Sequence, residues 1–371
     1  MRIAVLCAVA ACATPAPSPI HTFGAGALDR VTATAFDRAV NLYIAGWFEN
    51  TVDAGCGPVA GHSYLDSLVA SYAPDGTCRW SFGYGGRSGD DANAIAVDDA
   101  GHVWVAGSFM FDVDVGAFHL HEQGVGDIVL VEADAATGHV DNAVVLATPG
   151  ADEATALALD AKGEPIVCGV LDSQLFLAAL GTHGDVRWQR TLGTDNTVYA
   201  CSGLAVDETG TIAIAHEAID FVAHTCTSQV DSFTAAGVHG FTFPASGCAS
   251  ALAYGPGGAI YLATDLGITA LAHDGTIAWD LATPSLASIA VTGDTVWGGG
   301  HVLEQLTLDG QLRQLDPLAD TTTVSALAAG PDGQIAAGGQ FQYQIDLAGE
   351  HVDTTSPSDG FAAILPLQSA R

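Results

Sequence analysis

Short apolar runs alternate with polar turn residues along the whole chain, and one phrase of this kind recurs. The clearest copy reads ANAIAVDDAGHVWVAGSF from Ala92, and later copies read ATALALDAKGEPIVCG, CSGLAVDETGTIAIA and ASALAYGPGGAIYLA. No stretch shows the 3.6-residue apolar period of an amphipathic helix. Short apolar runs bounded by turn residues predict β-strands, and their recurrence every few dozen residues predicts a repeat architecture.

The residue that ends the first strand of each phrase gives a common alignment point. This point occurs at Asp37, Asp98, Asp160, Asp207, Gly255, Thr292 and Gly330. The resulting units approach the size of one four-stranded propeller blade, which is about 40–50 residues. The sequence therefore predicts an all-β fold, a seven-bladed β-propeller.

The connections between the predicted strands carry matching turn signals. The early repeats use Asp-x-x-Gly, for example at 98–101, and the late repeats use Gly-Pro-x-Gly, for example at 330–333. An aspartate caps the turn backbone, a proline has a suitable φ, and a glycine accepts the positive φ that ends a tight turn. A tryptophan recurs in the predicted fourth strand, and we expect it to pack between blades rather than to stack on a sugar: Trp80, Trp188 and Trp279.

The two ends of the chain complement each other in this alignment. The last repeat ends with a third-strand phrase, DGFAAILPL from Asp359, and has no fourth strand. The segment IHTFGAGALDRVTATAFD from Ile20 aligns with RWSFGYGGRSGDDANAIAVD and begins with an unmatched fourth strand. We expect this N-terminal strand to complete the last blade and close the ring, which removes exposed sheet edges.

Charge narrows the range of partners. The chain has 42 Asp and Glu against 10 Lys and Arg, a formal net charge of −32, and 49% hydrophobic residues. Nucleic-acid binding and attachment to an anionic membrane surface both depend on basic residues, so the composition argues against both. The hydrophobic fraction is ample for a folded core, and we expect a monomer that binds a protein or a glycan.

The N-terminal sequence MRIAVLCAVAACATPAPSPI predicts export. Its apolar run after Arg2 fits a secretory signal at residues 1–11 and is too short to span a bilayer. The tetrapeptide Val9-Ala10-Ala11-Cys12 resembles the bacterial lipobox, which implies lipidation of Cys12, a tether at residues 12–19 and an outer-membrane or cell-surface location. The alternative is secretion or a periplasmic location after cleavage near Ala13. Residues 20–371 form the propeller in either case.

Six cysteines remain after Cys7 and Cys12, and they suit an oxidising compartment. No pair has the CxxC spacing of a zinc or thioredoxin-like motif. Up to three disulfides are therefore expected, with fifteen pairings open. We expect them to act as local staples between loops.

Several phrases resemble the bacterial β-propeller repeat proteins, which are often secreted proteins or lipoproteins. These phrases are NAIAVDDAGHVWVAGSF, GTCRWSFGYGGRSGDD and ENTVDAGCGP. The resemblance is strong over residues 33–115 and weaker to the C-terminus, where repeats five to seven lose the anchoring aspartate. It implies the fold and a surface location, and it carries over no catalytic residue.

Acidic residues recur in the loops that enter the first strand of a repeat. Asp29, Asp90 and Asp152 each lie eight residues before their alignment point, and Asp91 and Glu153 follow two of them. In a propeller these loops surround one mouth of the central channel, where carboxylates suit Ca²⁺ or another ligand. The alternative is that each aspartate caps its own loop, and the repetition of the position favours this role.

Two further patterns lie in the insert of the second repeat. Asp112-x-Asp114-x-Gly116 lacks the later ligands of an EF-hand and has a counterpart, FENTVDAG, in the first repeat, so we interpret it as structural. His119 and His121 share one face of a strand, but the sequence identifies no third ligand and exposed loop histidines are the commoner case.

No G-x-S-x-G, HExxH or Walker-type motif is present, and no residue is assigned a catalytic role. The sequence favours a binding or scaffolding module whose ligand is unknown. A lyase or glycan-active enzyme with a site in the central channel is the alternative by analogy of fold, and a structural coat protein is the third.

Overall fold

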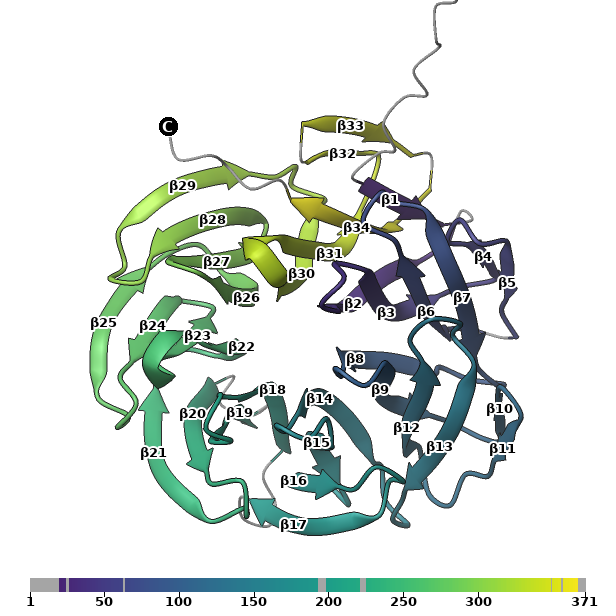
Figure 1. Ribbon diagram of the computed structural model, residues 1–371, viewed down its shortest axis with the longest axis horizontal. Helices are drawn as coiled ribbons and strands as arrows, with labels where there is room; N and C mark the ends of the chain where they lie inside the picture. The colour runs from purple at the N-terminus through teal and green to yellow at the C-terminus, as the bar shows by residue number, and fades with distance from the viewer. Residues whose placement is uncertain are drawn as a thin grey trace, which may run out of the picture.

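Seven four-stranded antiparallel sheets form a ring of blades, as Figure 1 shows. This computed structural model describes residues 20–24, 27–62, 64–192, 198–220, 225–347, 349–354 and 356–365. Within those ranges, the only helical segments are the single 3₁₀ turns Pro256–Gly258 and Pro331–Gly333, and no helix could cross a membrane. The predicted seven-bladed β-propeller is confirmed.

The first four blades follow the chain order from the innermost strand outward. Blade 1 consists of β2 (Asp29–Phe36), β3 (Leu42–Phe48), β6 (Asp66–Tyr72) and β7 (Cys78–Tyr84). Blade 2 consists of β8 (Asp91–Val97), β9 (His102–Phe109), β12 (Asp127–Asp134) and β13 (Val140–Leu146). Blade 3 consists of β14 (Glu153–Leu159), β15 (Pro165–Leu171), β16 (Gln174–Leu180) and β17 (Val186–Leu192). Blade 4 consists of β18 (Val198–Val206), β19 (Ile212–Asp220), β20 (Thr225–Phe233) and β21 (His239–Ala245).

The last three blades complete the ring. Blade 5 consists of β22 (Ala249–Tyr254), β23 (Ile260–Thr264), β24 (Gly267–Leu271) and β25 (Ile277–Ala282). Blade 6 consists of β26 (Leu286–Thr292), β27 (Thr295–Gly300), β28 (Val302–Thr307) and β29 (Leu312–Pro317). Blade 7 consists of β30 (Thr323–Ala329), β31 (Ile335–Phe341), β34 (Asp359–Leu365) and β1 (Ile20–Phe23).

The outer strand of blade 7 comes from the opposite end of the sequence. β1 pairs antiparallel with β34, so that Ile20 lies opposite Ala363 and Phe23 lies opposite Gly360. Blades 1 and 7 lie side by side in Figure 1. The unmatched strand at the N-terminal side therefore supplies the strand that the last repeat lacks.

The turns use the expected chemistry. Asp98 Oδ1 accepts the backbone N–H groups of Ala100 and His102, at 2.9 and 2.8 Å, and Gly101 has a φ of 95°. The first repeat has Val40 where the other early repeats have glycine, and Val40 takes a φ of 63°. The turn geometry is thus kept even where the preferred residue is missing.

Three adjacent blades carry an inserted β-hairpin between their second and third strands. Blade 7 has β32 (Gln344–Leu347) and β33 (Glu350–Asp353), blade 1 has β4 (Thr51–Asp53) and β5 (Pro58–Ala60), and blade 2 has β10 (Val113–Val115) and β11 (Phe118–Leu120). In an antiparallel blade these connections lie at the same edge as the loops that lead to the next blade. We call this side the hairpin face, and the side with the Asp-x-x-Gly turns the turn face.

Apolar clusters fill the spaces between blades. One cluster, for example, joins Tyr43 and Val69 of blade 1 to Val105 and Val131 of blade 2. The repeated tryptophans cover these clusters on the turn face: the indole N–H groups of Trp80, Trp188 and Trp279 donate to the backbone carbonyls of Ala135, Ala235 and Leu308 in the following blade. The expected packing of the tryptophans between blades is confirmed.

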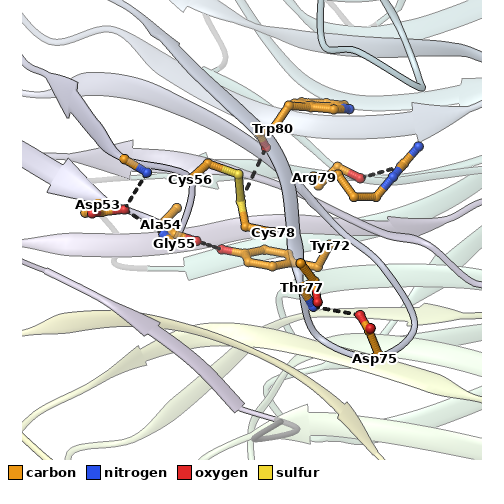
Figure 2. The surroundings of a disulfide bond; sticks show 12 residues. Asp53, Ala54, Gly55, Cys56, Tyr72, Asp75, Thr77, Cys78, Arg79 and Trp80 are labelled. Carbon is orange, nitrogen blue, oxygen red and sulfur yellow. Dashed lines mark hydrogen bonds between the residues drawn. A yellow bond between two sulfur atoms is a disulfide. The ribbon is translucent and has the colours of Figure 1, made fainter.

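Three disulfides lie within the described part of the chain, and two of them join neighbouring blades. Cys56–Cys78 ties the turn of the β4–β5 hairpin to β7 of the same blade, beside the Tyr72 hydroxyl, which donates to the Ala54 carbonyl at 2.9 Å (Figure 2). Cys168–Cys201 links β15 of blade 3 to β18 of blade 4, where both cysteines are buried. Cys226–Cys248 links blade 4 to the start of blade 5. The expected disulfides are present, but four of the six cysteines lie in strands rather than loops: Cys78, Cys168, Cys201 and Cys226.

Candidate functional site

The aspartates expected at the channel mouth are buried loop anchors. Asp90 Oδ2 accepts the N–H of Gly86 at 2.7 Å and Oδ1 accepts that of Met110 at 3.1 Å. Asp152 likewise accepts the N–H groups of Thr148 and Asp172, and Asp29 accepts that of Glu49. Each aspartate therefore ties the loop that enters its blade to the start of the loop after the second strand. These contacts match the capping role, while a role in Ca²⁺ binding stays a prediction.

A second set of buried aspartates lies beside the first. Asp66, Asp127 and Asp359 each open a third strand, and Asp66 and Asp127 accept loop N–H groups four residues upstream. Burial, with Asp66 and Asp91 nearby, raises the pKa of Asp90 to about 7. Burial, with Asp152 nearby, also raises the pKa of Asp127. The sequence signal for this second set was the aspartate that opens DSLVASY, DIVLVE and DGFAAIL.

Asp91 and Glu153 occupy equivalent positions at the start of neighbouring inner strands. Glu153 Oε1 accepts a hydrogen bond from Asn93 Nδ2 at 3.3 Å, and burial together with the charge of Asp91 raises the pKa of Glu153. Arg30 holds the same position in blade 1 and donates from Nε to Ser325 Oγ at 3.3 Å. The structure thus brings Asp91 and Glu153 together, while an arginine rather than a third acid occupies the equivalent position in blade 1.

The channel is encircled by a polar belt that the sequence analysis missed. All seven inner strands have a register shift at the same place. The residues in the shift are Thr32, Asn93, Thr155, Ser202, Ser250, Ala287 and Ser325, and all of them except Ala287 are polar. Four of these side chains donate to a backbone carbonyl of the next blade's inner strand: Thr32 to Ala92, Asn93 to Ala154, Thr155 to Cys201, and Ser325 to Val31. The sequence signal that could have identified the belt was the single polar residue within the apolar run of most inner strands.

A cluster of titratable side chains also lies in blade 4. Asp231 accepts from His216 Nε2 at 2.9 Å and from His239 Nε2 at 3.1 Å, and Thr242 also donates to it. Burial by itself raises the pKa of Asp231, but these hydrogen bonds outweigh burial and hold the pKa well below its usual range. The members belong to β19, β20 and β21, so the cluster lies outside the inner strands that surround the channel.

A groove lies between blades 6 and 7 and has a volume of about 680 Å³. Its apolar lining consists of Trp297, Leu303, Pro317, Leu318, Leu347 and Leu365. Its polar lining consists of Gln305, Asp316, Asp346, Glu350 and His351. The β32–β33 hairpin contributes several of these residues. We call this feature the blade 6–7 groove.

Sequence reasoning did not find the blade 6–7 groove because its residues come from the least regular repeats. The hairpin side chain His351 donates from Nδ1 to Asp346 Oδ1 at 2.6 Å, and this hydrogen bond raises the pKa of His351. Its Nε2 lies 3.2 Å from Asp353 Oδ1. The groove therefore combines an apolar surface with a rim of three carboxylates, at Asp316, Asp346 and Glu350.

Comparison with solved structures places the chain among propellers. YCF48 bound to D1 peptide matches with a TM-score of 0.51 at 12% identity, over 96% of this chain and 98% of that chain. BamB from Moraxella catarrhalis matches with a TM-score of 0.47 at 15% identity, over 92% and 84%. A streptogramin B lyase matches with a TM-score of 0.40 at 13% identity, over 74% and 93%. No family model and no curated protein matches the sequence. The chain is a seven-bladed β-propeller, and at these identities the likeness extends to the fold alone.

Proposed function

We propose that this propeller is a binding module that holds an extended segment of a partner protein in the blade 6–7 groove. The observation that carries the proposal is the groove itself, whose volume of about 680 Å³ lies within the range of about 300–1,000 Å³ typical of ligand sites. Its apolar lining can bury side chains of a ligand, and its polar rim can fix their orientation. The β32–β33 hairpin of blade 7 forms one wall.

The charge of the groove selects the ligand. Within the part of the chain that the structure describes, Asp316, Asp346 and Glu350 line it together with one histidine and no lysine or arginine. The whole chain has a formal net charge of −32, so its field attracts cations and repels acidic molecules. A segment that carries basic residues beside apolar ones can pair with the carboxylates of the rim and bury its apolar side chains against the apolar lining. The D1 peptide bound to YCF48, which has a similar fold, supports a peptide as the ligand class.

The test uses peptides of defined charge. A fluorescein-labelled peptide of alternating leucine and lysine is titrated with the purified protein, and a peptide with glutamate in place of lysine serves as its charge-reversed counterpart. We expect binding of the lysine peptide only. The triple variant Asp316→Asn, Asp346→Asn, Glu350→Gln should bind it at least tenfold more weakly.

A matched triple variant controls for the loss of overall charge. Asp75→Asn, Asp274→Asn and Asp309→Asn remove three exposed carboxylates from turns on the turn face. We expect this control to change the affinity less than twofold. Equal weakening by the two triple variants, or equal binding of both peptides, contradicts the proposal.

We propose further that the module acts at the surface of the cell that exports it, held by lipid at Cys12. Cys12 lies outside the described residues, so the proposal rests on the lipobox resemblance and on three disulfides, which persist in oxidising compartments. Metabolic labelling with palmitate tests it. We expect label in the wild-type protein and none in Cys12→Ala, whereas an unlabelled wild-type protein supports plain secretion instead.

A further inference from the structure

The hairpin of blade 2 brings three potential metal ligands together. In the pairing of β10 with β11, Asp114 lies opposite His119, and His121 lies two residues further along the chain. The imidazole rings of His119 and His121 are 4.6 Å apart between centroids. Asp112 precedes β10, and one ligand atom from each of Asp112, His119 and His121 lies within 4.8 Å of the other two. The structure thus supplies the third ligand that the sequence did not identify.

One of the two donor distances matches that around a single small ion, and the other is slightly longer. Asp112 Oδ2 lies 3.3 Å from His121 Nδ1 and 4.0 Å from His119 Nε2. Ligand bonds of about 2.0–2.2 Å in tetrahedral geometry separate neighbouring donor atoms by about 3.3–3.6 Å. The other oxygen, Asp112 Oδ1, accepts the N–H of Glu122 at 3.3 Å. That hydrogen bond holds the carboxylate with Oδ2 toward the imidazoles.

A neighbouring carboxylate orients one of the imidazoles. His119 Nδ1 lies 2.6 Å from Asp114 Oδ1, so this nitrogen carries the proton that is donated to Asp114. In the neutral imidazole the lone pair is then on Nε2, on the side of Asp112. Metal-binding histidines commonly donate their second nitrogen to a carboxylate in this way. Asp114 therefore has the position of an outer partner that fixes the tautomer of His119.

We propose that Asp112, His119 and His121 bind a divalent transition-metal ion of the zinc type, with Asp114 as a positioning residue. Two imidazoles and one carboxylate suit Zn²⁺ and its neighbours in the first transition row, whereas Ca²⁺ and Mg²⁺ prefer oxygen ligands alone. The side chains of Asp112, His119 and His121 are 53%, 54% and 71% exposed, so an ion can reach them from solvent. Three protein ligands leave a coordination position for water or for a group of a bound partner.

The hairpin of blade 7 shows which part of this arrangement belongs to the repeat. There, Asp346 pairs across the strands with His351, and the two atoms Asp346 Oδ1 and His351 Nδ1 are again 2.6 Å apart. Gln344 stands in the position of Asp112, and Asp353 stands in that of His121. The aspartate–histidine pair is therefore repeated, while the second imidazole is particular to blade 2. The blade 7 hairpin is a natural control because it offers only one imidazole.

Titration calorimetry with ZnCl₂ on the purified, untagged full-length protein tests the proposal. We expect one site per chain, and at least tenfold weaker binding in His119→Ala and in His121→Ala. His351→Ala should bind Zn²⁺ within twofold of the wild type, and an excess of CaCl₂ should not weaken Zn²⁺ binding by more than twofold. The assignment is overturned if the wild type binds Zn²⁺ no more tightly than His121→Ala does. It is also overturned if His351→Ala weakens Zn²⁺ binding as much as His121→Ala does.

The role of Asp114 has its own readout. Removal of such an outer partner weakens metal binding by about tenfold to a hundredfold. We expect Asp114→Asn to weaken Zn²⁺ binding in this range while the metal-free variant melts at the wild-type temperature, and Asp114→Glu to recover part of the affinity. Replacement of Zn²⁺ by Co²⁺ should also shift the visible absorption bands in Asp114→Asn. An unchanged affinity and spectrum in Asp114→Asn excludes the positioning role.

Discussion

The indole nitrogen of Trp80 donates a hydrogen bond to the backbone carbonyl of Ala135, 3.1 Å away, and so joins the outer strand of blade 1 to a turn of blade 2. Gly138 of the same turn lies against the indole, because a Cβ built on Gly138 would come within 2.6 Å of the ring. The same arrangement joins Trp188 to Gly237 and Trp279 to Gly310, in alternate blades. Each glycine thus serves both the turn conformation and the contact with the neighbouring blade.

This arrangement predicts different costs for alanine at two turn glycines. Gly138 and Gly101 both have positive φ, at 72° and 95°, but a Cβ on Gly101 would meet nothing within 4 Å. We expect Gly101→Ala to lower the free energy of unfolding by about 1 kcal/mol through backbone strain, and Gly138→Ala by about 2–4 kcal/mol because the indole must also move. Urea denaturation measures both. Equal losses in the two variants would show that the tryptophan contact adds nothing.

The polar belt predicts a second stability effect. Thr155 Oγ1 donates to the Cys201 carbonyl at 2.7 Å across the boundary between blades 3 and 4. Replacement of the hydroxyl by a methyl group in Thr155→Val leaves that carbonyl without this donor, and we expect a loss of about 1–2 kcal/mol in the free energy of unfolding. Thr155→Ser keeps the hydroxyl and should lose less. If Thr155→Val is as stable as the wild type, the hydrogen bonds of the polar belt do not contribute to the stability of the ring.

The disulfides should differ in their effect on global stability. Cys168–Cys201 joins two blades and closes a loop with a sequence separation of 33, so its removal should lower the free energy of unfolding by about 3 kcal/mol. Cys56–Cys78 ties a hairpin to its own blade, and that hairpin can open locally while the ring stays folded. We expect the double alanine variant at Cys168 and Cys201 to melt at a lower temperature than the one at Cys56 and Cys78. The reverse order contradicts this assignment.

The fold could be predicted in detail because each repeat carries the same pattern of strands and turns. The alignment points Asp37 to Gly330 fixed the number of blades, and the unmatched strand at Ile20 indicated its partner in the last blade. The blade 7 hairpin, Gln344–Leu347 and Glu350–Asp353, was not recognised from the sequence as a counterpart of the inserts in blades 1 and 2. The pairing of Cys168 with Cys201 depends on which blades are neighbours, and fifteen pairings were open from the sequence.

The buried acids make stability depend on pH. Asp90 has a pKa of about 7 in the folded protein against an ordinary value of 3.8, so the folded state binds its proton more tightly than the unfolded state does. The stabilisation from this proton is present at acid pH and is lost as the pH rises through about 7. Asp90→Asn stays neutral, so its free energy of unfolding relative to the wild type should rise by about 1–3 kcal/mol between pH 4.5 and 8.

A turn aspartate provides the control for the effect of pH. Hydrogen bonds from Thr77 lower the pKa of Asp75, so its stabilising contribution is lost as the pH falls through its folded pKa. The free energy of unfolding of Asp75→Asn, relative to the wild type, should therefore fall as the pH rises toward 3.8 and should change little between pH 4.5 and 8. Urea denaturation at a series of pH values measures both variants. A pH-independent difference for Asp90→Asn would show that its carboxyl is ionised throughout.

Candidate sites were harder to predict than the fold, for a physical reason. Asp29, Asp90 and Asp152 were conspicuous in the sequence because they repeat, and they repeat because each blade needs its loops anchored. Asp112 joins His119 and His121 only through the register of one hairpin, which spacing along the chain does not reveal. The blade 6–7 groove likewise depends on residues from two blades, such as Trp297 and Leu347, that are distant in sequence.

The most direct test of the proposed function is to locate the bound peptide. A leucine–lysine peptide that carries a photoreactive benzoylphenylalanine is irradiated with the protein, and mass spectrometry identifies the crosslinked residues. We expect crosslinks at the blade 6–7 groove, at residues such as Leu318 and Leu347, that are lost in the Asp316→Asn, Asp346→Asn, Glu350→Gln variant. Crosslinks at the channel mouth near Asp91 and Glu153, or on the β4–β5 hairpin, with none in the groove, would contradict the proposed binding site.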